Sequence, residues 1–228
     1  MYNTILFDVD DTLLDFKAGE LLCLKQTITA LKVPYTPVLE ARYLAINAGL
    51  WEAYEAGQIR REQIFTRRFT QLFREFHIDA DGLAAEKRYH HLLDQQAIVL
   101  PHVAATLEAL RDCRLYVVSN GVEAVQHARL TKAGLIDFFA DIFVSDVIGA
   151  PKPTMAFFDY VIKRIPHFDP RRTLIVGDSL TSDIQGGRNA KIDSVWFNPH
   201  LVPNRTAITP VYQLSEFAAL TTLVAGTR

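Results

Sequence analysis

Short apolar runs alternate with helical patterns along most of the chain, and this alternation limits the possible folds more than any other feature. The runs are rich in Val, Ile, Leu and Phe and are bounded by charged or turn-forming residues. Such runs are typical of parallel strands covered by helices on both faces. We predict an α/β fold with strands at Thr4–Asp8, Leu115–Ser119, Ile142–Ser145, Thr173–Gly177 and Ser194–Phe197.

The interval between the first two predicted strands is far longer than one crossover helix needs. Thr36 followed by Pro37 indicates a helix start within it. Apolar residues recur there at helical spacing, namely Ile64, Phe65, Phe69, Leu72, Phe73 and Phe76. We predict an all-α insertion at residues 16–95 in a catalytic core formed by 1–15 and 96–228. An insertion after a strand's carboxyl end lies over the crevice where open α/β sheets bind ligands, so it is a candidate cap.

Composition excludes several classes of function. The formal net charge of the 228 residues is −2 and no long basic block occurs, which argues against a bound nucleic-acid polymer. We interpret the basic stretch RREQIFTRRF, residues 60–69, as the solvated polar face of a helix. Cys23 and Cys113 lie far apart, as is typical of a reducing compartment. With no signal-peptide pattern and no membrane-spanning apolar run, we expect a cytoplasmic protein, monomer or homodimer, that acts on a small molecule.

Polar side chains follow the predicted strands at or just beyond the point where each ends. Because the carboxyl ends of parallel strands share one edge of a sheet, we expect these side chains to converge. They are Asp8, Asp10, Ser119, Asn120, Lys152, Asp178 and Asp183. Four carboxylates facing one ammonium group cannot all stay ionised without another cation, and their hard oxygen atoms suit Mg²⁺. The sequence therefore predicts a magnesium site.

A magnesium ion would turn this acidic edge into a receptor for an anion. Lys152, the Ser119 hydroxyl and backbone N–H groups could then hold phosphate oxygens. Two carboxylates two residues apart, Asp8 and Asp10, suit two roles. One can attack phosphorus and form an aspartyl-phosphate, and the other can protonate the leaving oxygen and later deprotonate water. We predict a small phosphomonoester as the substrate.

Four short motifs occur in order, and together they resemble the haloacid dehalogenase-like phosphatases with a small α-helical cap. They are D-x-D-x-T at Asp8–Thr12, S-N-G at Ser119–Gly121, K-P at Lys152–Pro153 and G-D-x-x-x-x-D at Gly177–Asp183. The resemblance covers essentially the whole chain. It implies a Rossmann-like core with a five-stranded parallel sheet and a helical cap that closes over the substrate.

The resemblance also assigns roles to residues. It implies that Asp8 is the nucleophile and that Asp10 is the general acid and base. Mg²⁺ would be held by Asp8, Asp178 and the backbone carbonyl of Asp10, with Asp183 in support. Lys152 and Ser119 would bind the phosphoryl group, and Asn120 would act mostly through its backbone N–H.

A finer resemblance concerns the predicted cap. The stretches NAGLWEAYEAGQI at Asn47–Ile59, GDSLTSDIQGGRNAKID and VWFNPH look like the bacterial 5′-nucleotidases that act on pyrimidine monophosphates, including non-canonical ones. Asn47, Trp51 and Tyr54 share one helix face. The two aromatic rings could stack on a base while Asn47 reads its edge. Alternatively, both rings only pack the interior of the cap.

Other functions fit parts of the same pattern. A sugar-phosphate or phosphoglycolate phosphatase would use the same chemistry, and a phosphomutase would share its first step. A haloacid dehalogenase needs neither the metal nor a second aspartate, so the presence of Asp10 weighs against it. A non-catalytic binding module built on this fold would normally have lost Asp8, Asp10, Lys152 or Asp178, and all four are present.

Overall fold

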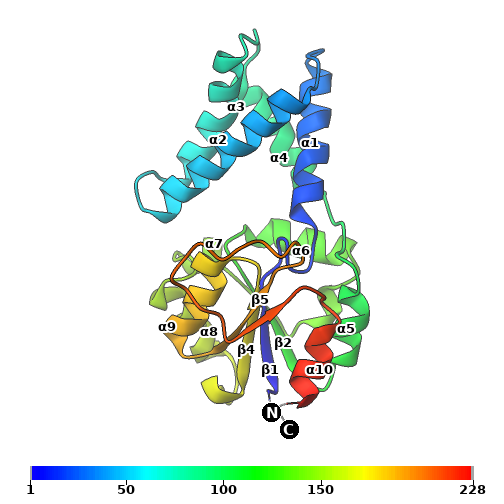
Figure 1. The fold of residues 1–228 in the computed structure, drawn as a ribbon, viewed down its shortest axis with the longest axis vertical. Coiled ribbons are helices and arrows are strands. Elements are labelled where there is room, and N and C mark those ends of the chain that lie inside the picture. The colour runs from blue at the N-terminus through cyan, green and yellow to red at the C-terminus, as the bar shows by residue number, and fades with distance from the viewer. Residues whose placement is uncertain (1, 227–228) are drawn as a thin grey trace. The chain divides into compact units, whose positions relative to one another are not determined.

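The computed structural model describes residues 2–226, which fall into two compact units (Figure 1). The core unit comprises the chain up to Phe16 and from Ala97 onward, and the cap unit comprises Lys17–Gln96. Each boundary lies one residue beyond the position expected from the sequence. The chain therefore leaves the core unit soon after its first strand, forms the cap unit, and returns to the core unit before its second strand.

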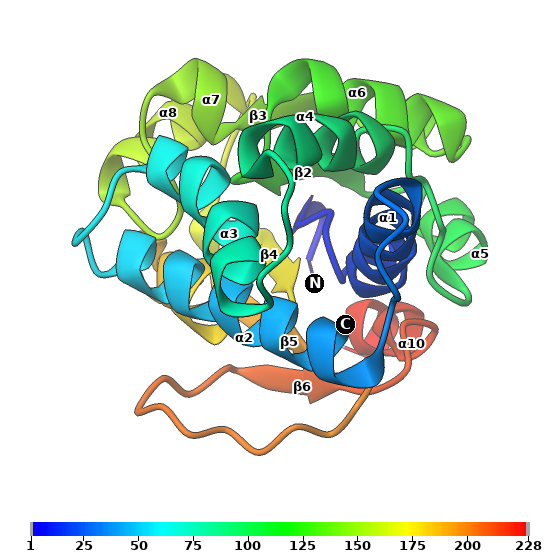
Figure 2. The same ribbon diagram turned by 90° about the horizontal axis from the view of Figure 1, so that it is seen from above.

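The core unit is built on a parallel sheet of six strands in the order β3-β2-β1-β4-β5-β6. The strands are β1 (Thr4–Phe7), β2 (Arg114–Ser119), β3 (Asp141–Val144), β4 (Thr173–Gly177), β5 (Asp193–Phe197) and β6 (Tyr212–Leu214). The predicted α/β class is confirmed, but the expected five strands were one too few. The extra strand β6 lies at the sheet edge beside β5 (Figure 2), and its three residues are too short a run to give a strand pattern.

Helices cover both faces of this sheet, as the buried strands require. Ile5 and Phe7 of β1 pack in one apolar cluster with residues of α5, α6 and α10, whereas Leu6 packs in another with residues of α8. Figure 1 shows α5 and α10 on one side of the sheet and α8 and α9 on the other. The helices of the core unit are α5 (Val103–Ala109), α6 (Glu123–Lys132), α7 (Ser145–Ile148), α8 (Met155–Arg164), α9 (Gln185–Ala190) and α10 (Ala219–Gly226). Within residues 2–226, no helix has both the length and the apolar character needed to cross a membrane.

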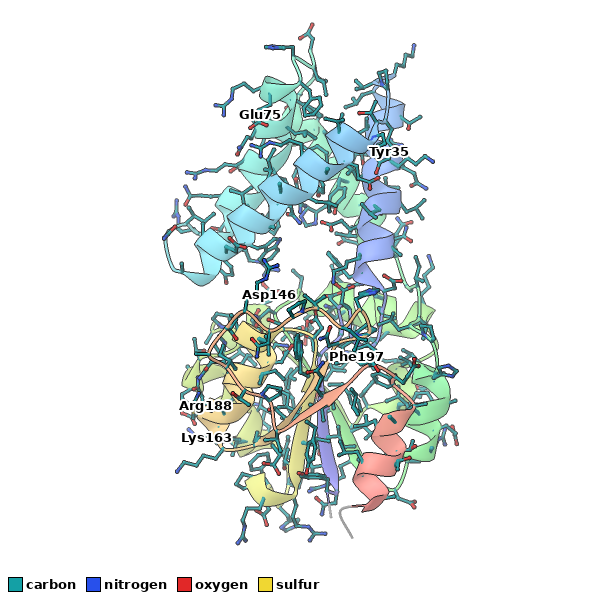
Figure 3. All side chains as sticks on the ribbon, in the orientation of Figure 1. Tyr35, Glu75, Asp146, Lys163, Arg188 and Phe197 are labelled. Atoms are coloured by element: carbon teal, nitrogen blue, oxygen red, sulfur yellow. The ribbon has the colours of Figure 1, made fainter. Side chains whose placement is uncertain are left out.

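The cap unit is helical, as its apolar spacing predicted. It consists of α1 (Phe16–Ala30), α2 (Pro37–Glu55), α3 (Arg61–Glu75) and α4 (Gly82–Leu93). The predicted start at Thr36 is confirmed, since its hydroxyl accepts a hydrogen bond from the Leu39 N–H at 3.2 Å. Arg42 of α2 donates two hydrogen bonds to Glu75 of α3, which is labelled in Figure 3.

The interpretation of residues 60–69 as a solvated basic face is wrong at Arg68. Its side chain is only 3% exposed and donates to both carboxylate oxygens of Glu86 on α4, at 2.7 and 2.6 Å. The guanidinium also lies over the Tyr89 ring, 4.5 Å from its centroid. A buried arginine is tolerated here because its partner is an acidic residue that the sequence places 18 positions away.

Candidate active site

The site lies at the carboxyl edge of three neighbouring strands. β1 pairs in parallel with β2 on one side and with β4 on the other. Asp8 follows the last residue of β1, Ser119 is the last residue of β2, and Asp178 follows β4. The Asp8 N–H donates to the Val176 carbonyl at 2.9 Å, so the backbone of Asp8 is held by the same hydrogen-bond ladder that joins β1 and β4. The predicted convergence of these strand ends is what the sheet order produces.

Lys152 is the buried centre of the site. Its side chain is 2% exposed, and Nζ donates to Asp8 Oδ1 at 2.7 Å, to Asp183 Oδ1 at 2.6 Å and to the Val118 carbonyl at 2.7 Å. An ammonium group has three protons, and these three acceptors satisfy all of them. The lysine is therefore held in one orientation, with its charge shared between two aspartates.

Burial and charge act in opposite directions on this pair. Desolvation raises the pKa of Asp8 to about 7, although the positive charge of Lys152 lowers it. Burial by itself lowers the pKa of Lys152, but the attraction of Asp183 and Asp8 outweighs it and leaves that pKa above its ordinary value. The ammonium is thus charged at neutral pH, whereas Asp8 titrates there unless further positive charge is supplied.

Asp8, Asp178 and Asp183 form an acidic cluster that can accept a cation. Each offers a carboxylate oxygen, and these oxygens lie within 4.8 Å of one another. Lys152 alone does not neutralise three carboxylates, and oxygen donors of this kind suit Mg²⁺. The Trp196 indole N–H donates to the Asp178 carbonyl at 2.8 Å, which ties the loop after β4 to β5.

Gly177 is required because Asp183 folds back against it. Asp183 belongs to a short π-helical turn, Leu180–Ile184, and its Oδ2 accepts from the Ser179 N–H at 3.1 Å. A Cβ atom on residue 177 would lie 2.1 Å from that same Oδ2. The glycine of the G-D-x-x-x-x-D motif is thus explained by close packing of its two ends.

Asn120 ties the Lys152 segment to the end of β2. Its Nδ2 donates to the Lys152 carbonyl at 3.1 Å, and its Oδ1 accepts from the Lys152 N–H at 2.8 Å. The side chain therefore positions the backbone of Lys152. Phosphate contact by Asn120 and Ser119 stays a prediction.

Asp10 is held by two residues of α6 that the sequence did not single out. Arg129 donates to its Oδ1 at 2.6 Å, and Gln126 donates to its Oδ2 at 2.9 Å. The only signal available was their spacing of three positions on the helix that follows the S-N-G motif, which places them on one face. The structure thus adds Gln126 and Arg129 to the candidate site.

The three predicted cap residues lie on α2 and make contacts within the cap unit. Asn47 is buried, donates to Glu20 at 2.8 Å and accepts from Arg68 at 3.1 Å. Trp51 is partly buried and packs edge-to-face on Tyr54 and Phe65, with centroids 5.9 and 6.5 Å away. Contact of these residues with a nucleobase stays a prediction.

The sheet and the site together define the class of the protein: an α/β fold with a lysine-centred acidic site at the carboxyl edge of a parallel sheet. The sequence matches the haloacid dehalogenase-like hydrolases over residues 2–191, and the chain belongs to this family. The family resemblance predicted from the motifs is therefore confirmed.

Individual relatives extend this result. The chain is 41% identical to the HAD-hydrolase YfnB of Bacillus subtilis, over 96% of this chain and 94% of YfnB. A crystal structure of YfnB bound to magnesium covers 98% of both chains with a TM-score of 0.94. The pyrimidine 5′-nucleotidase PynA of Streptococcus pneumoniae is 37% identical, over 96% of this chain and 93% of PynA. The pyrimidine 5′-nucleotidase YjjG of Escherichia coli is 29% identical, over 98% of both chains.

The raised pKa of Asp8 predicts that metal binding at the acidic cluster depends on pH. Because the folded state holds this proton up to about pH 7, Asp8 contributes most to stability below about pH 4, and that contribution is lost as pH rises through 7. A Mg²⁺ ion at the cluster would bind the ionised carboxylate and would have to displace the proton at low pH. We expect Mg²⁺ to raise the melting temperature more at about pH 8 than at about pH 5.5, with affinity differing by about tenfold or more.

Thermal melts with and without Mg²⁺ at both pH values provide the measurement. In Asp8→Asn the residue no longer titrates, so the remaining effect of Mg²⁺ should vary much less with pH. An equal Mg²⁺ shift at both pH values in the wild-type protein would contradict the raised pKa of Asp8.

Proposed function

We propose that the chain is a Mg²⁺-dependent phosphomonoesterase that hydrolyses pyrimidine nucleoside 5′-monophosphates through an aspartyl-phosphate on Asp8. The observation that carries this proposal is the pairing of Asp8 with buried Lys152 at 2.7 Å, beside the acidic cluster. The positive charge of Lys152 can neutralise a phosphoryl oxygen as well as a carboxylate. The proposed reaction requires this, because the Asp8 carboxylate is an anion that attacks a phosphate dianion. The pyrimidine preference is supported by similarity to PynA and YjjG.

The two carboxylate oxygens of Asp8 differ in their hydrogen bonds. Oδ1 accepts from Lys152 at 2.7 Å, whereas Oδ2 has a long contact of 3.4 Å with the Thr12 hydroxyl. In the proposed first step an Asp8 oxygen bonds to phosphorus, the bond from phosphorus to the ester oxygen breaks, and Asp10 gives that oxygen a proton. In the second step, Asp10 takes a proton from the water that attacks phosphorus, the bond from phosphorus to the Asp8 oxygen breaks, and inorganic phosphate leaves with the Asp8 carboxylate restored.

The residues present fit the magnesium ion that this chemistry calls for. Asp8 and Asp178, with the backbone carbonyl of Asp10, would hold it, and Asp183 would support it from the π-helical turn. When bound, the ion supplies positive charge against the negative charge that develops on the phosphoryl oxygens. Lys152 supplies the complementary positive charge and is already fixed by its three acceptors.

The cap unit supplies the proposed preference for a base. Trp51 and Tyr54 keep partly exposed aromatic surfaces on α2, and rings of this kind can stack on a pyrimidine. In this proposal Asn47 recognises the edge of the base, and its hydrogen bonds with Glu20 and Arg68 hold its side chain in position. A sugar-phosphate phosphatase would use the same core residues and would gain nothing from the aromatic pair.

A substrate panel tests the proposal. We expect phosphate release with Mg²⁺ and none with EDTA, and higher kcat/KM for UMP, dUMP and dTMP than for purine monophosphates and sugar phosphates. Trp51→Ala should lower kcat/KM for pyrimidine nucleotides by about tenfold and leave that for a sugar phosphate, which has no aromatic ring, nearly unchanged. Tyr35→Ala, in the loop between α1 and α2, is the matched aromatic control and should change neither.

Each outcome assigns the substrate. Equal losses on all substrates in Trp51→Ala would show that the residue only packs the cap. A clear advantage for sugar phosphates or purine nucleotides in the wild-type protein would refute the pyrimidine preference while leaving the phosphatase chemistry in place.

A further inference from the structure

We infer that Gln126 and Arg129 of α6 are positioning residues that set Asp10 for proton transfer and Ser119 for phosphate binding. The inference rests on the proposed function, because it concerns how Asp10 and Ser119 perform their proposed roles. Neither α6 residue lies in one of the four motifs. Both are buried, and both reach the site from a helix that packs on the sheet.

The contacts of Asp10 form a closed ring of hydrogen bonds. Arg129 Nη1 donates to Asp10 Oδ1 at 2.6 Å and to Gln126 Oε1 at 3.1 Å. Gln126 Nε2 completes the ring by donating to Asp10 Oδ2 at 2.9 Å. A carboxyl group held by both oxygens has no freedom to rotate, and each oxygen keeps a second lone pair for a reacting group. The ring therefore defines the direction from which Asp10 exchanges a proton.

The second amide proton of Gln126 acts on Ser119. Gln126 Nε2 donates to Ser119 Oγ at 3.0 Å, and the Gly121 N–H donates to the same oxygen at 3.0 Å. A hydroxyl oxygen has two lone pairs, and these two donors occupy both. The Ser119 proton can therefore only be donated outward, which is the role that binding a phosphoryl oxygen needs. Gln126 thus links the proton-transfer residue to a phosphate-binding residue.

Burial separates this arrangement from an ordinary surface ion pair. The Arg129 side chain is 4% exposed, whereas that of Asp10 is 33% exposed. The cation is enclosed and its carboxylate partner faces outward, so the rigid member of the pair orients the accessible one. Gly121 makes room for this, because a Cβ atom there would lie 2.5 Å from Gln126 Nε2.

The inference predicts a loss that depends on the leaving group. An alkoxide, such as the 5′-oxygen of a nucleoside, needs a proton as it departs, whereas p-nitrophenolate does not. We expect Arg129→Ala to lower kcat/KM for UMP by about thirtyfold or more, and for p-nitrophenyl phosphate by less than about threefold. Gln126→Leu also removes a donor to Ser119, so it should lower kcat/KM for both substrates, but for UMP by about tenfold more than for p-nitrophenyl phosphate. The ratio kcat/KM is the appropriate quantity because it excludes the later hydrolysis of the aspartyl-phosphate.

Conservative and control variants complete the test. Arg129→Lys keeps a donor near Asp10 and should recover part of the UMP activity. Arg111→Ala removes an arginine from an exposed ion pair with Glu108 in the same unit, and it should leave both substrates unchanged. If Arg129→Ala does not fold, Gln126→Leu decides the matter, since it replaces a neutral side chain and keeps the ion pair between Arg129 and Asp10.

Equal losses on both substrates, or no loss on either, would overturn the inference and leave Gln126 and Arg129 with a purely structural role. Failure of the proposed function is distinguishable, because the wild-type protein would then hydrolyse neither UMP nor p-nitrophenyl phosphate with Mg²⁺.

Discussion

Asp8→Asn is expected to abolish phosphomonoester hydrolysis, with a fall in kcat of about 10⁴-fold or more. An amide cannot form the acyl phosphate, and the nearby carboxylate of Asp10 is held by Arg129 and Gln126 rather than by Lys152. The fold should survive, because the substitution keeps the shape of the side chain and Lys152 retains Asp183 as its partner at 2.6 Å. Steady-state kinetics beside circular dichroism would measure both effects.

Asp146→Asn provides the matched control for this experiment. Asp146 lies exposed on α7 of the same unit and is labelled in Figure 3, so the same chemical change there should leave the rate unchanged. Turnover by Asp8→Asn at near the wild-type rate, in a preparation free of reversion or deamidation, would exclude Asp8 as the nucleophile.

Lys152→Met is expected to lower both activity and stability. The ammonium group contacts two buried carboxylates, so its removal leaves them facing each other without a counter-charge. Breaking a buried ion pair by removing one member costs about 3–5 kcal/mol of unfolding free energy. Loss of a fixed positive charge at the phosphoryl site should lower kcat by about 10²–10³-fold. Denaturant melts and kinetics measure the two effects separately.

Magnesium distinguishes the two roles of Lys152. Mg²⁺ should restore part of the lost stability by neutralising the acidic cluster, but it should not restore the rate, because the fixed positive charge beside Asp8 is gone. Lys163→Met, on the exposed side of α8, is the matched control and should change neither quantity. A wild-type rate in Lys152→Met would show that the lysine only balances charge in the fold.

The sequence predicts which residues come together at the centre of the site, because parallel strands place the residues at their carboxyl ends on one edge of the sheet. Asp8, Ser119 and Asp178 each sit at the end of a recognisable apolar strand, and parallel strands end on the same side. Lys152 could be placed at the same edge because it comes after β3, the strand that pairs with β2. The magnesium site is predicted from the chemistry of these residues, because clustered carboxylates need a cation.

Contacts that depend on how helices pack could not be predicted in the same way. Arg129 and Arg68 both look like ordinary helix-surface arginines in the sequence, yet each is buried against a carboxylate distant in sequence. Their burial depends on how whole elements pack, which a local pattern does not contain. The short strand β6 was missed for a similar reason, because its pairing with β5 gives it a structure that its own three residues do not specify.

Direct detection of the aspartyl-phosphate tests the proposed role of Asp8 as the nucleophile. The wild-type protein with Mg²⁺ and UMP would be quenched in acid within the first turnovers, digested and mapped by mass spectrometry, with Asp8→Asn treated in parallel. We predict one phosphoryl group on the peptide that contains Asp8, labile at alkaline pH, and none in Asp8→Asn. Trapped phosphate on another residue, or full turnover with no phosphorylated peptide, would contradict the account.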